Sequence, residues 1–98
     1  MVYAARASTS VLAAGGADPS LVGADVAFGQ PDAQQCLILP KLRWVEVTTA
    51  GYTRYDTPEF QEAFRARGAA FSNVSTVFAD PCAQHVLAMM LALGRNLL

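Results

Sequence analysis

Short apolar segments alternate with amphipathic segments along this chain of 98 residues. Four of these segments are short and rich in strand-forming residues, and they predict β-strands at residues 11–14, 26–29, 43–48 and 69–74. Apolar and polar residues alternate in the third segment, so Val45 and Val47 should face one way and their neighbours the other. The second segment (VAFG) has no polar residue and is expected to be a buried strand.

The clearest helix signal lies in residues 56–68 (DTPEFQEAFRARG). Thr57 is a good N-cap, and Pro58 suits the first helical position because it has no N–H to leave unpaired. Gly68 can take the left-handed conformation that ends many helices. A short helix is predicted at residues 31–37, whereas the loop 17–25 should hold at most one helical turn.

A last helix is predicted from Asp80 and Pro81, which repeat the order of cap and proline, to the end of the chain. Its segment 86–94 (VLAMMLALG) is about half as long as a bilayer-spanning helix needs to be, so we expect a buried helix. Because this helix is apolar almost all round, we expect it to need more than one packing partner.

Strands that alternate with helices predict an α/β fold with a parallel sheet and flanking helices. We expect one partial domain over residues 1–98, with an α/β lobe at 1–77 and a connecting helix at 78–98 that would lead into a further segment. The chain stops where such an apolar helix would be expected to continue into further residues, so it looks cut at that end.

The composition and net charge limit the classes of binding partner that we expect. Hydrophobic residues make up 53% of the chain and charged residues 15%, so part of the apolar surface should face a partner. The net charge of −1 and the scattered basic residues exclude nucleic acid and anionic membrane as expected partners. Cys36 and Cys82 fit no metal-binding spacing, and the sequence leaves open a disulfide between them or two free thiols. We interpret them as free thiols of a cytoplasmic protein.

The stretch TTAGYT at residues 48–53 directly follows the strand RWVEV. Small side chains there let other groups approach the backbone, and successive N–H groups can converge on an anion. The alternative is that this stretch is only the exit from a strand. The residues alone leave both interpretations open.

Two stretches resemble a known family. LPKLRWVEVTTAGYTRYD and the segment 73–95 (NVSTVFADPCAQHVLAMMLALGR) are similar to the N-terminal portion of D-isomer-specific 2-hydroxyacid dehydrogenases, over roughly residues 23–98. The resemblance implies a flavodoxin-like substrate-binding domain whose partner is a Rossmann domain that binds NAD or NADP. Two positions depart from the family pattern: Thr76 stands where a glycine is usual, and Thr53 where an aspartate is common.

The resemblance implies that backbone amides of Ala50, Gly51 and Tyr52 bind the carboxylate of a small 2-oxo or 2-hydroxy acid. It suggests four further residues that could line the cleft: Gln30, Asn73, Val77 and Phe78. The structural alternative is that Gln30 and Asn73 only bond the loop backbone and that Val77 and Phe78 are packing residues. No catalytic residue can be assigned, since the family's acid–base residues come from later segments, and His85 is interpreted as structural.

No G-x-G-x-x-G fingerprint is present, so neither NAD nor NADP is expected to bind this chain alone, and we expect the chain alone to be inactive. Two alternatives remain. One is a flavodoxin-type module that binds FMN, although Ala50 replaces a hydroxyl residue of that phosphate loop and TRYD separates the loop from a helix. The other is a non-catalytic fragment whose last helix docks onto a partner, with a homodimer as the simplest case.

Overall fold

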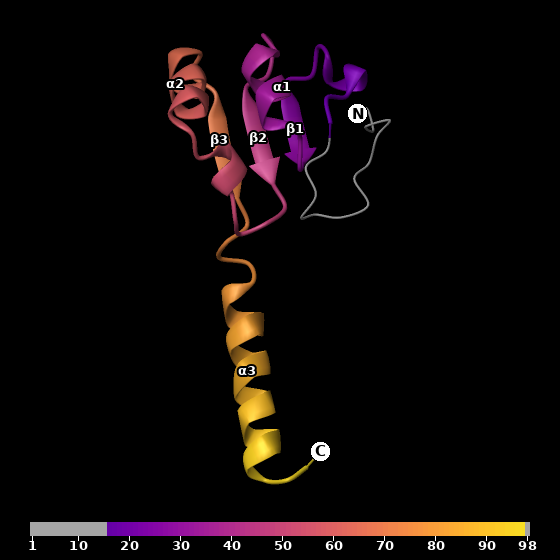
Figure 1. Ribbon diagram of the computed structural model, residues 1–98, viewed down its shortest axis with the longest axis vertical. Helices are drawn as coiled ribbons and strands as arrows, with labels where there is room; N and C mark the ends of the chain where they lie inside the picture. The colour runs from indigo at the N-terminus through magenta and orange to yellow at the C-terminus, as the bar shows by residue number, and fades with distance from the viewer. Residues whose placement is uncertain (1–15, 98) are drawn as a thin grey trace.

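The computed structural model describes residues 16–97, which form an α/β lobe and a projecting helix (Figure 1). The strands and helices follow in the order β1 (Val26–Gly29), α1 (Ala33–Ile38), β2 (Trp44–Val47), α2 (Pro58–Ala66), β3 (Ala70–Asn73) and α3 (Ala79–Gly94). Two single 3-10 turns, η1 (Pro19–Leu21) and η2 (Thr53–Tyr55), lie in the loops. The strand predicted at residues 11–14 lies outside the described residues.

The three described strands form one parallel sheet in the order β1-β2-β3, which confirms the predicted fold class. β1 has the predicted bounds, whereas β2 and β3 are each one residue shorter at both ends than predicted. Val45 and Val47 are buried and Trp44 is exposed, as the alternation in β2 predicts.

One face of the sheet carries the core. Ala27, Val45 and Val47 on that face pack against side chains of α1 and α2, including Cys36, Phe60 and Phe64. The opposite face has no covering helix among the described residues. The prediction that β1 is a buried strand is therefore wrong, because Val26 and Phe28 are 52% and 75% exposed.

α2 begins and ends as its sequence predicts. The Thr57 hydroxyl oxygen accepts a hydrogen bond from the N–H of Phe60 at 3.2 Å, and Pro58 follows the cap. Gly68 has a φ of 66° just beyond the helix, where the left-handed conformation ends it. Phe60 and Phe64 are buried against the sheet and stack with ring centroids 4.1 Å apart.

α3 differs from its prediction in two ways. It begins at Ala79 with Phe78 as a cap that makes no side-chain hydrogen bond, so Asp80 lies within the first turn instead of capping the helix. Second, no residue of α3 is buried, because the helix extends away from the lobe and no other described element packs against it (Figure 1). The predicted burial of residues 86–94 is thus wrong for the described chain. Within residues 16–97, no helix has the length and apolar character needed to cross a bilayer.

The two cysteines are free thiols, as expected, in opposite environments. Cys36 is fully buried, and its burial, together with the nearby Asp32 carboxylate, raises the pKa of its thiol from 9.0 to about 11. Cys82 is exposed on α3. The two thiols should therefore differ strongly in reactivity.

We expect a thiol-modifying disulfide reagent at pH 8 to react with Cys82 at the rate of a free thiol and with Cys36 at least about a hundredfold more slowly. The Cys82→Ala variant should leave only the slow reaction, and urea should make both thiols reactive. Because the pKa of Cys36 is raised in the folded state, the contribution of this thiol to the free energy of unfolding should be fully present below pH 9.0 and be lost as the pH rises toward 11. Two fast equivalents in the native protein would contradict the burial of Cys36.

Candidate functional site

The candidate site lies where the parallel strands end together. The loop of residues 48–52 follows β2, which is the central strand, and so lies between the ends of β1 and β3. The N–H of Thr48 donates to the carbonyl of Gly29 at 3.3 Å, and the N–H of Val74 donates to the carbonyl of Thr49 at 3.4 Å. These bonds hold the first two loop residues to both neighbouring strands.

Side chains from the two outer strands brace the rest of the loop. Gln30 Nε2 donates to Thr49 Oγ1 at 3.0 Å, and this hydroxyl donates to the carbonyl of Gly51 at 2.7 Å. Asn73 Nδ2 donates to the carbonyl of Ala50 at 2.9 Å. Side chains thus bond the carbonyl oxygens of Ala50 and Gly51, which braces the loop without using the N–H groups of residues 50–52.

The N–H groups of Ala50, Gly51 and Tyr52 donate no hydrogen bond to any residue between 16 and 97. All three residues are exposed. A Cβ added at Gly51 would meet no atom of the described chain within 4 Å, and the φ of Gly51 is not left-handed. Neither packing against described residues nor the backbone conformation therefore requires glycine at position 51. An anion nest needs neighbouring residues in right-handed and left-handed conformations, so Gly51 does not form one.

The remaining sequence-predicted residues divide into two groups. Gln30 and Asn73 lie at the site, and both donate hydrogen bonds to the loop, whereas their role as lining of a cleft stays a prediction. Val77 and Phe78 are 62% and 46% exposed in the turn before α3, and they share no hydrogen bond or ring contact with the loop among the described residues. Tyr52 places its ring centroid 6.2 Å from that of Phe71 and remains 45% exposed.

Thr49 is the functional candidate that sequence reasoning missed. Its hydroxyl joins Gln30 to the loop by accepting from one and donating to the other. Two signals were available in the sequence: a threonine at the second position after the central strand, and a glycine two residues later whose carbonyl a hydroxyl can reach.

A second polar chain crosses the uncovered face of the sheet. Trp44 Nε1 donates to Ser72 Oγ at 2.7 Å, and this hydroxyl donates to Glu46 Oε2. The register places Glu46 opposite Ser72, so the strand alternation could have predicted this contact. No histidine lies near enough to make it a catalytic set, because His85, the chain's one histidine, is on the projecting α3.

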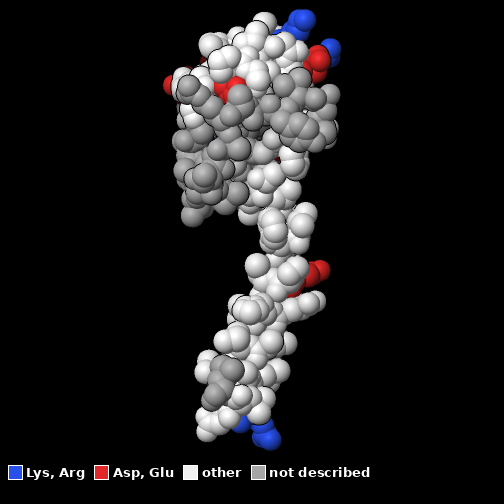
Figure 2. Space-filling model, turned by 90° about the vertical axis from the view of Figure 1, so that its right-hand side faces the viewer, with Lys and Arg blue, Asp and Glu red and all other residues white. Residues whose placement is uncertain are grey.

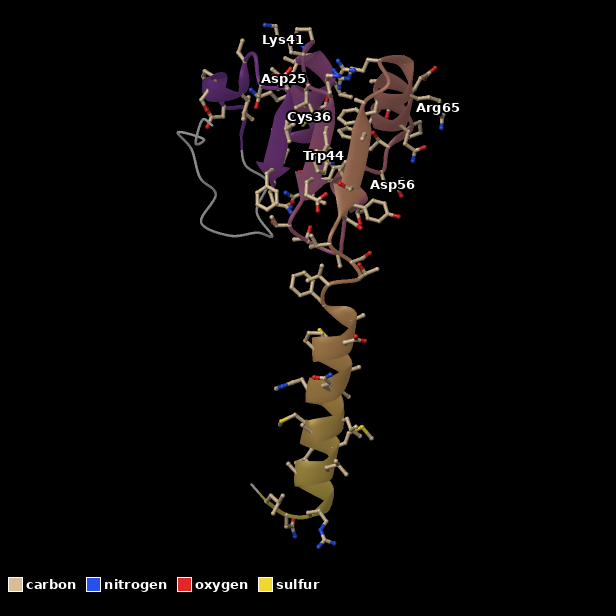
Figure 3. The ribbon with its side chains drawn as sticks, turned by 180° about the vertical axis from the view of Figure 1, so that it is seen from behind. Asp25, Cys36, Lys41, Trp44, Asp56 and Arg65 are labelled. Carbon is tan, nitrogen blue, oxygen red and sulfur yellow. The ribbon has the colours of Figure 1, made fainter. Side chains whose placement is uncertain are left out.

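A pocket of about 510 Å³ lies at the opposite, amino-terminal end of the strands and contains no residue of the loop. Figure 3 shows Asp25 and Lys41, two of its lining residues, at the end of the lobe farthest from α3. Arg67 also lines this pocket, but its guanidinium is bonded to the carbonyls of Cys36 and Leu39. The pocket is therefore a separate feature from the loop.

The surroundings of the loop suit binding more than acid–base chemistry. Asp56, the nearest following carboxylate, accepts a hydrogen bond from Gln61 Nε2 at 2.7 Å on the exposed side of α2. No group of histidine, cysteine and carboxylate side chains in the described part of the chain could hold a metal ion. The loop does not open directly into a helix, since η2 precedes α2, so the order of elements does not favour the flavin alternative.

Comparison with protein-family models, with curated proteins and with solved structures finds no match for this chain. The family resemblance of the two sequence stretches therefore remains a hypothesis, and any function must be argued from the loop and its surroundings.

Proposed function

We propose that this chain is the substrate-binding lobe of an NAD(P)-dependent D-2-hydroxyacid dehydrogenase. In this proposal the backbone N–H groups of Ala50, Gly51 and Tyr52 bind the carboxylate of a small 2-oxo or 2-hydroxy acid. The observation that carries it is that these three amides are exposed and unpartnered among the described residues, while the loop carbonyls are bonded. Open α/β sheets commonly bind ligands at the carboxyl ends of their strands.

In this proposal the lobe binds the substrate, and other segments supply the cofactor and the acid–base residues. Backbone amides can hold an acid's charged end, but a hydride must come from a nicotinamide bound elsewhere. The resemblance assigns that cofactor, NAD or NADP, to a Rossmann domain and the acid–base residues to later segments of the family's chain. The proposal further treats the lobe as flavodoxin-like, α3 as the connection between the two domains, and the whole protein as cytoplasmic.

The proposal predicts weak but localised binding of an acid by the chain alone. Titration with glyoxylate should shift the backbone amide resonances of Ala50, Gly51 and Tyr52 in a ¹⁵N-correlated NMR spectrum, with a dissociation constant of about 1–10 mM, as expected for a few charge-assisted hydrogen bonds in an open site. The uncharged amide of the same acid should cause much smaller shifts, because these N–H groups favour a negative oxygen.

Two variants sharpen this experiment. Gly51→Ala should fold normally, since a Cβ meets nothing there, yet weaken glyoxylate binding by about tenfold or more by covering the approach to the amides. Thr49→Val removes the hydroxyl that braces the loop and should also weaken binding, whereas the adjacent Thr48→Val, whose hydroxyl makes no hydrogen bond with a described residue, should not. Shifts that centre on Lys41 and Arg43 instead would place the anion in the distant pocket and refute the proposal.

A second candidate is favoured by one observation. The side chains of α3 are exposed along its whole length, including Leu87, Met90 and Leu91, which are 56%, 65% and 59% exposed. Water-exposed apolar surface of this extent is typical of an interaction surface. The chain could therefore act by association as well as by ligand binding, and the two functions are compatible.

A further inference from the structure

The pocket at the amino-terminal end of the strands concentrates much of the positive charge of the chain. The sequence has seven lysine and arginine residues, and three of them, Lys41, Arg43 and Arg67, line this pocket of about 510 Å³. Its lining also includes one carboxylate, that of Asp25. Figure 2 shows basic and acidic atoms close together at the end of the lobe farthest from α3. Because the net charge of the whole chain is −1, this concentration of cations is a local feature.

The sheet places Arg43 beside Asp25. These residues directly precede β2 and β1, and the N–H of Arg43 donates to the carbonyl of Asp25 at 2.8 Å. The parallel register of the two strands continues this pairing, so the two backbones cannot move apart without breaking the sheet. Lys41 lies two residues earlier, in the turn that leads into β2. The backbone that carries these three charged residues is therefore fixed by the fold.

The three cationic side chains differ in what they bind. The guanidinium of Arg67 is already bonded to the carbonyls of Cys36 and Leu39. Lys41 and Arg43 are exposed, and neither side chain makes an ion pair or a hydrogen bond with any residue between 16 and 97, although a carboxylate lines the same pocket. The backbone N–H of Lys41 also donates to no described residue. Two cationic side chains and one N–H group in the turn are thus available to a ligand.

We propose that this pocket binds a small phosphate ester, whose phosphate group is held by Lys41 and Arg43. An arginine guanidinium bonds two phosphate oxygens with its planar fork, and a lysine ammonium adds a compact point charge. Arg67 contributes a third positive charge, which its bonds to α1 keep in place. Asp25 repels a bare anion but accepts a hydrogen bond from a hydroxyl group, so the preferred ester carries a hydroxyl near its phosphate.

The size and charge of the pocket favour this class of ligand over two others. Its volume of about 510 Å³ lies within the range of roughly 300–1,000 Å³ that is usual for small-molecule sites. A nucleic acid would need basic residues along a longer stripe than one pocket provides. A simple carboxylate such as glyoxylate carries one negative charge, whereas a phosphate ester carries about −1.5 to −2 at pH 7. The pocket should therefore prefer the phosphate ester to the acid that we propose for the loop of residues 48–52.

Titration of the full chain with glycerol phosphate, at pH 7.5 and constant ionic strength, tests the proposal. Backbone amide shifts in a ¹⁵N-correlated NMR spectrum should centre on Lys41, Arg43 and Asp25, with a dissociation constant of about 1 mM. Replacing Lys41 and Arg43 together by glutamine should weaken binding by at least about tenfold, and these exposed, unbonded side chains should be replaceable without unfolding the lobe. Arg65→Gln, which removes an exposed charge outside the pocket, should leave binding unchanged.

Asp25→Ala tests the role of the carboxylate. In this variant inorganic phosphate should bind more tightly than in the wild-type chain, and the preference for glycerol phosphate over inorganic phosphate should disappear. A preference that survives in Asp25→Ala would show that this carboxylate does not bind the hydroxyl. Equal binding by the wild-type chain and the double glutamine variant, or shifts that centre on residues 50–52, would overturn the pocket as a phosphate site. Glyoxylate binding by the loop is followed through different resonances, so the two proposals fail separately.

Discussion

Replacing Phe60 by alanine is expected to lower the free energy of unfolding of the lobe by about 3–5 kcal/mol. Phe60 is 3% exposed and contacts three other rings, with centroids 4.1 Å from Phe64, 5.5 Å from Tyr55 and 5.7 Å from Phe71. The truncation would leave a cavity between α2 and the sheet, which the surrounding strands cannot close. Among the described residues only one face of the sheet is covered, and a domain this small is marginally stable, so part of the variant should be unfolded under native conditions.

Urea unfolding followed by tryptophan fluorescence measures this loss, because Trp44 is the chain's only tryptophan and lies on β2. The probe reports on the lobe and not on α3. The matched control is Phe28→Ala, in which the same atoms are removed from a side chain that is 75% exposed. Its free energy of unfolding should change by less than about 0.5 kcal/mol. If Phe28→Ala costs as much as Phe60→Ala, the uncovered sheet face is covered in solution.

The elements that the sequence predicts well are those decided by neighbouring residues. Thr57, Pro58 and Gly68 each act within one turn of α2, and all three have the predicted role. The alternation in β2 predicts which residues share the buried face, because residues two apart in a strand point to the same side. Interactions between neighbouring residues are thus enough to set the two ends of α2 and the face of β2 on which each residue lies.

Predictions that depend on distant parts of the chain were less successful. The apolar composition of β1 and of α3 indicates burial, but a side chain is buried only if another layer covers it. The described lobe supplies one layer, so Val26 and Phe28 on β1 and the apolar residues of α3 remain exposed. The position of Asp80 was wrong for a local reason instead: the N–H of Cys82 donates to the carbonyl of Phe78 at 3.0 Å, so the helix starts before Asp80.

The position of the candidate site followed from topology, whereas its bonding did not. Parallel strands end at one edge, so the loop of residues 48–52 had to lie beside Gln30 and Asn73. Which atoms bond was not predictable, because the partners are 19 and 23 residues apart in the sequence. Bonds to the ends of both neighbouring strands hold the loop, and the N–H groups of residues 50–52 have no hydrogen-bond partner among the described residues. An anion binding there would need little reorganisation of the loop.

Replacing Arg67 by methionine should lower the free energy of unfolding by about 2–3 kcal/mol, since two charge-assisted bonds to backbone carbonyls are lost. Arg67 Nη1 donates to the carbonyl of Leu39 at 2.7 Å and Nη2 to that of Cys36 at 2.5 Å, which satisfies the last turn of α1. Its guanidinium carbon also lies 4.7 Å from the ring centroid of Phe64. The loss is partly offset because Arg67 Nε is buried without a hydrogen-bond partner among residues 16–97, and methionine removes that unfavourable group.

Arg65→Met is the matched control, because Arg65 has an exposed side chain on the same helix (Figure 3) and makes no side-chain hydrogen bond with the described residues. Its change should stay within about 0.5 kcal/mol. Arg67→Lys should recover only part of the loss, since an ammonium lacks the planar fork that reaches two carbonyls. The loss in Arg67→Met should also persist in high salt, which screens pairs of exposed charges but not these partly buried bonds to neutral oxygens. Full recovery by lysine would mean that positive charge, and not the two-pronged bond to α1, is what Arg67 contributes.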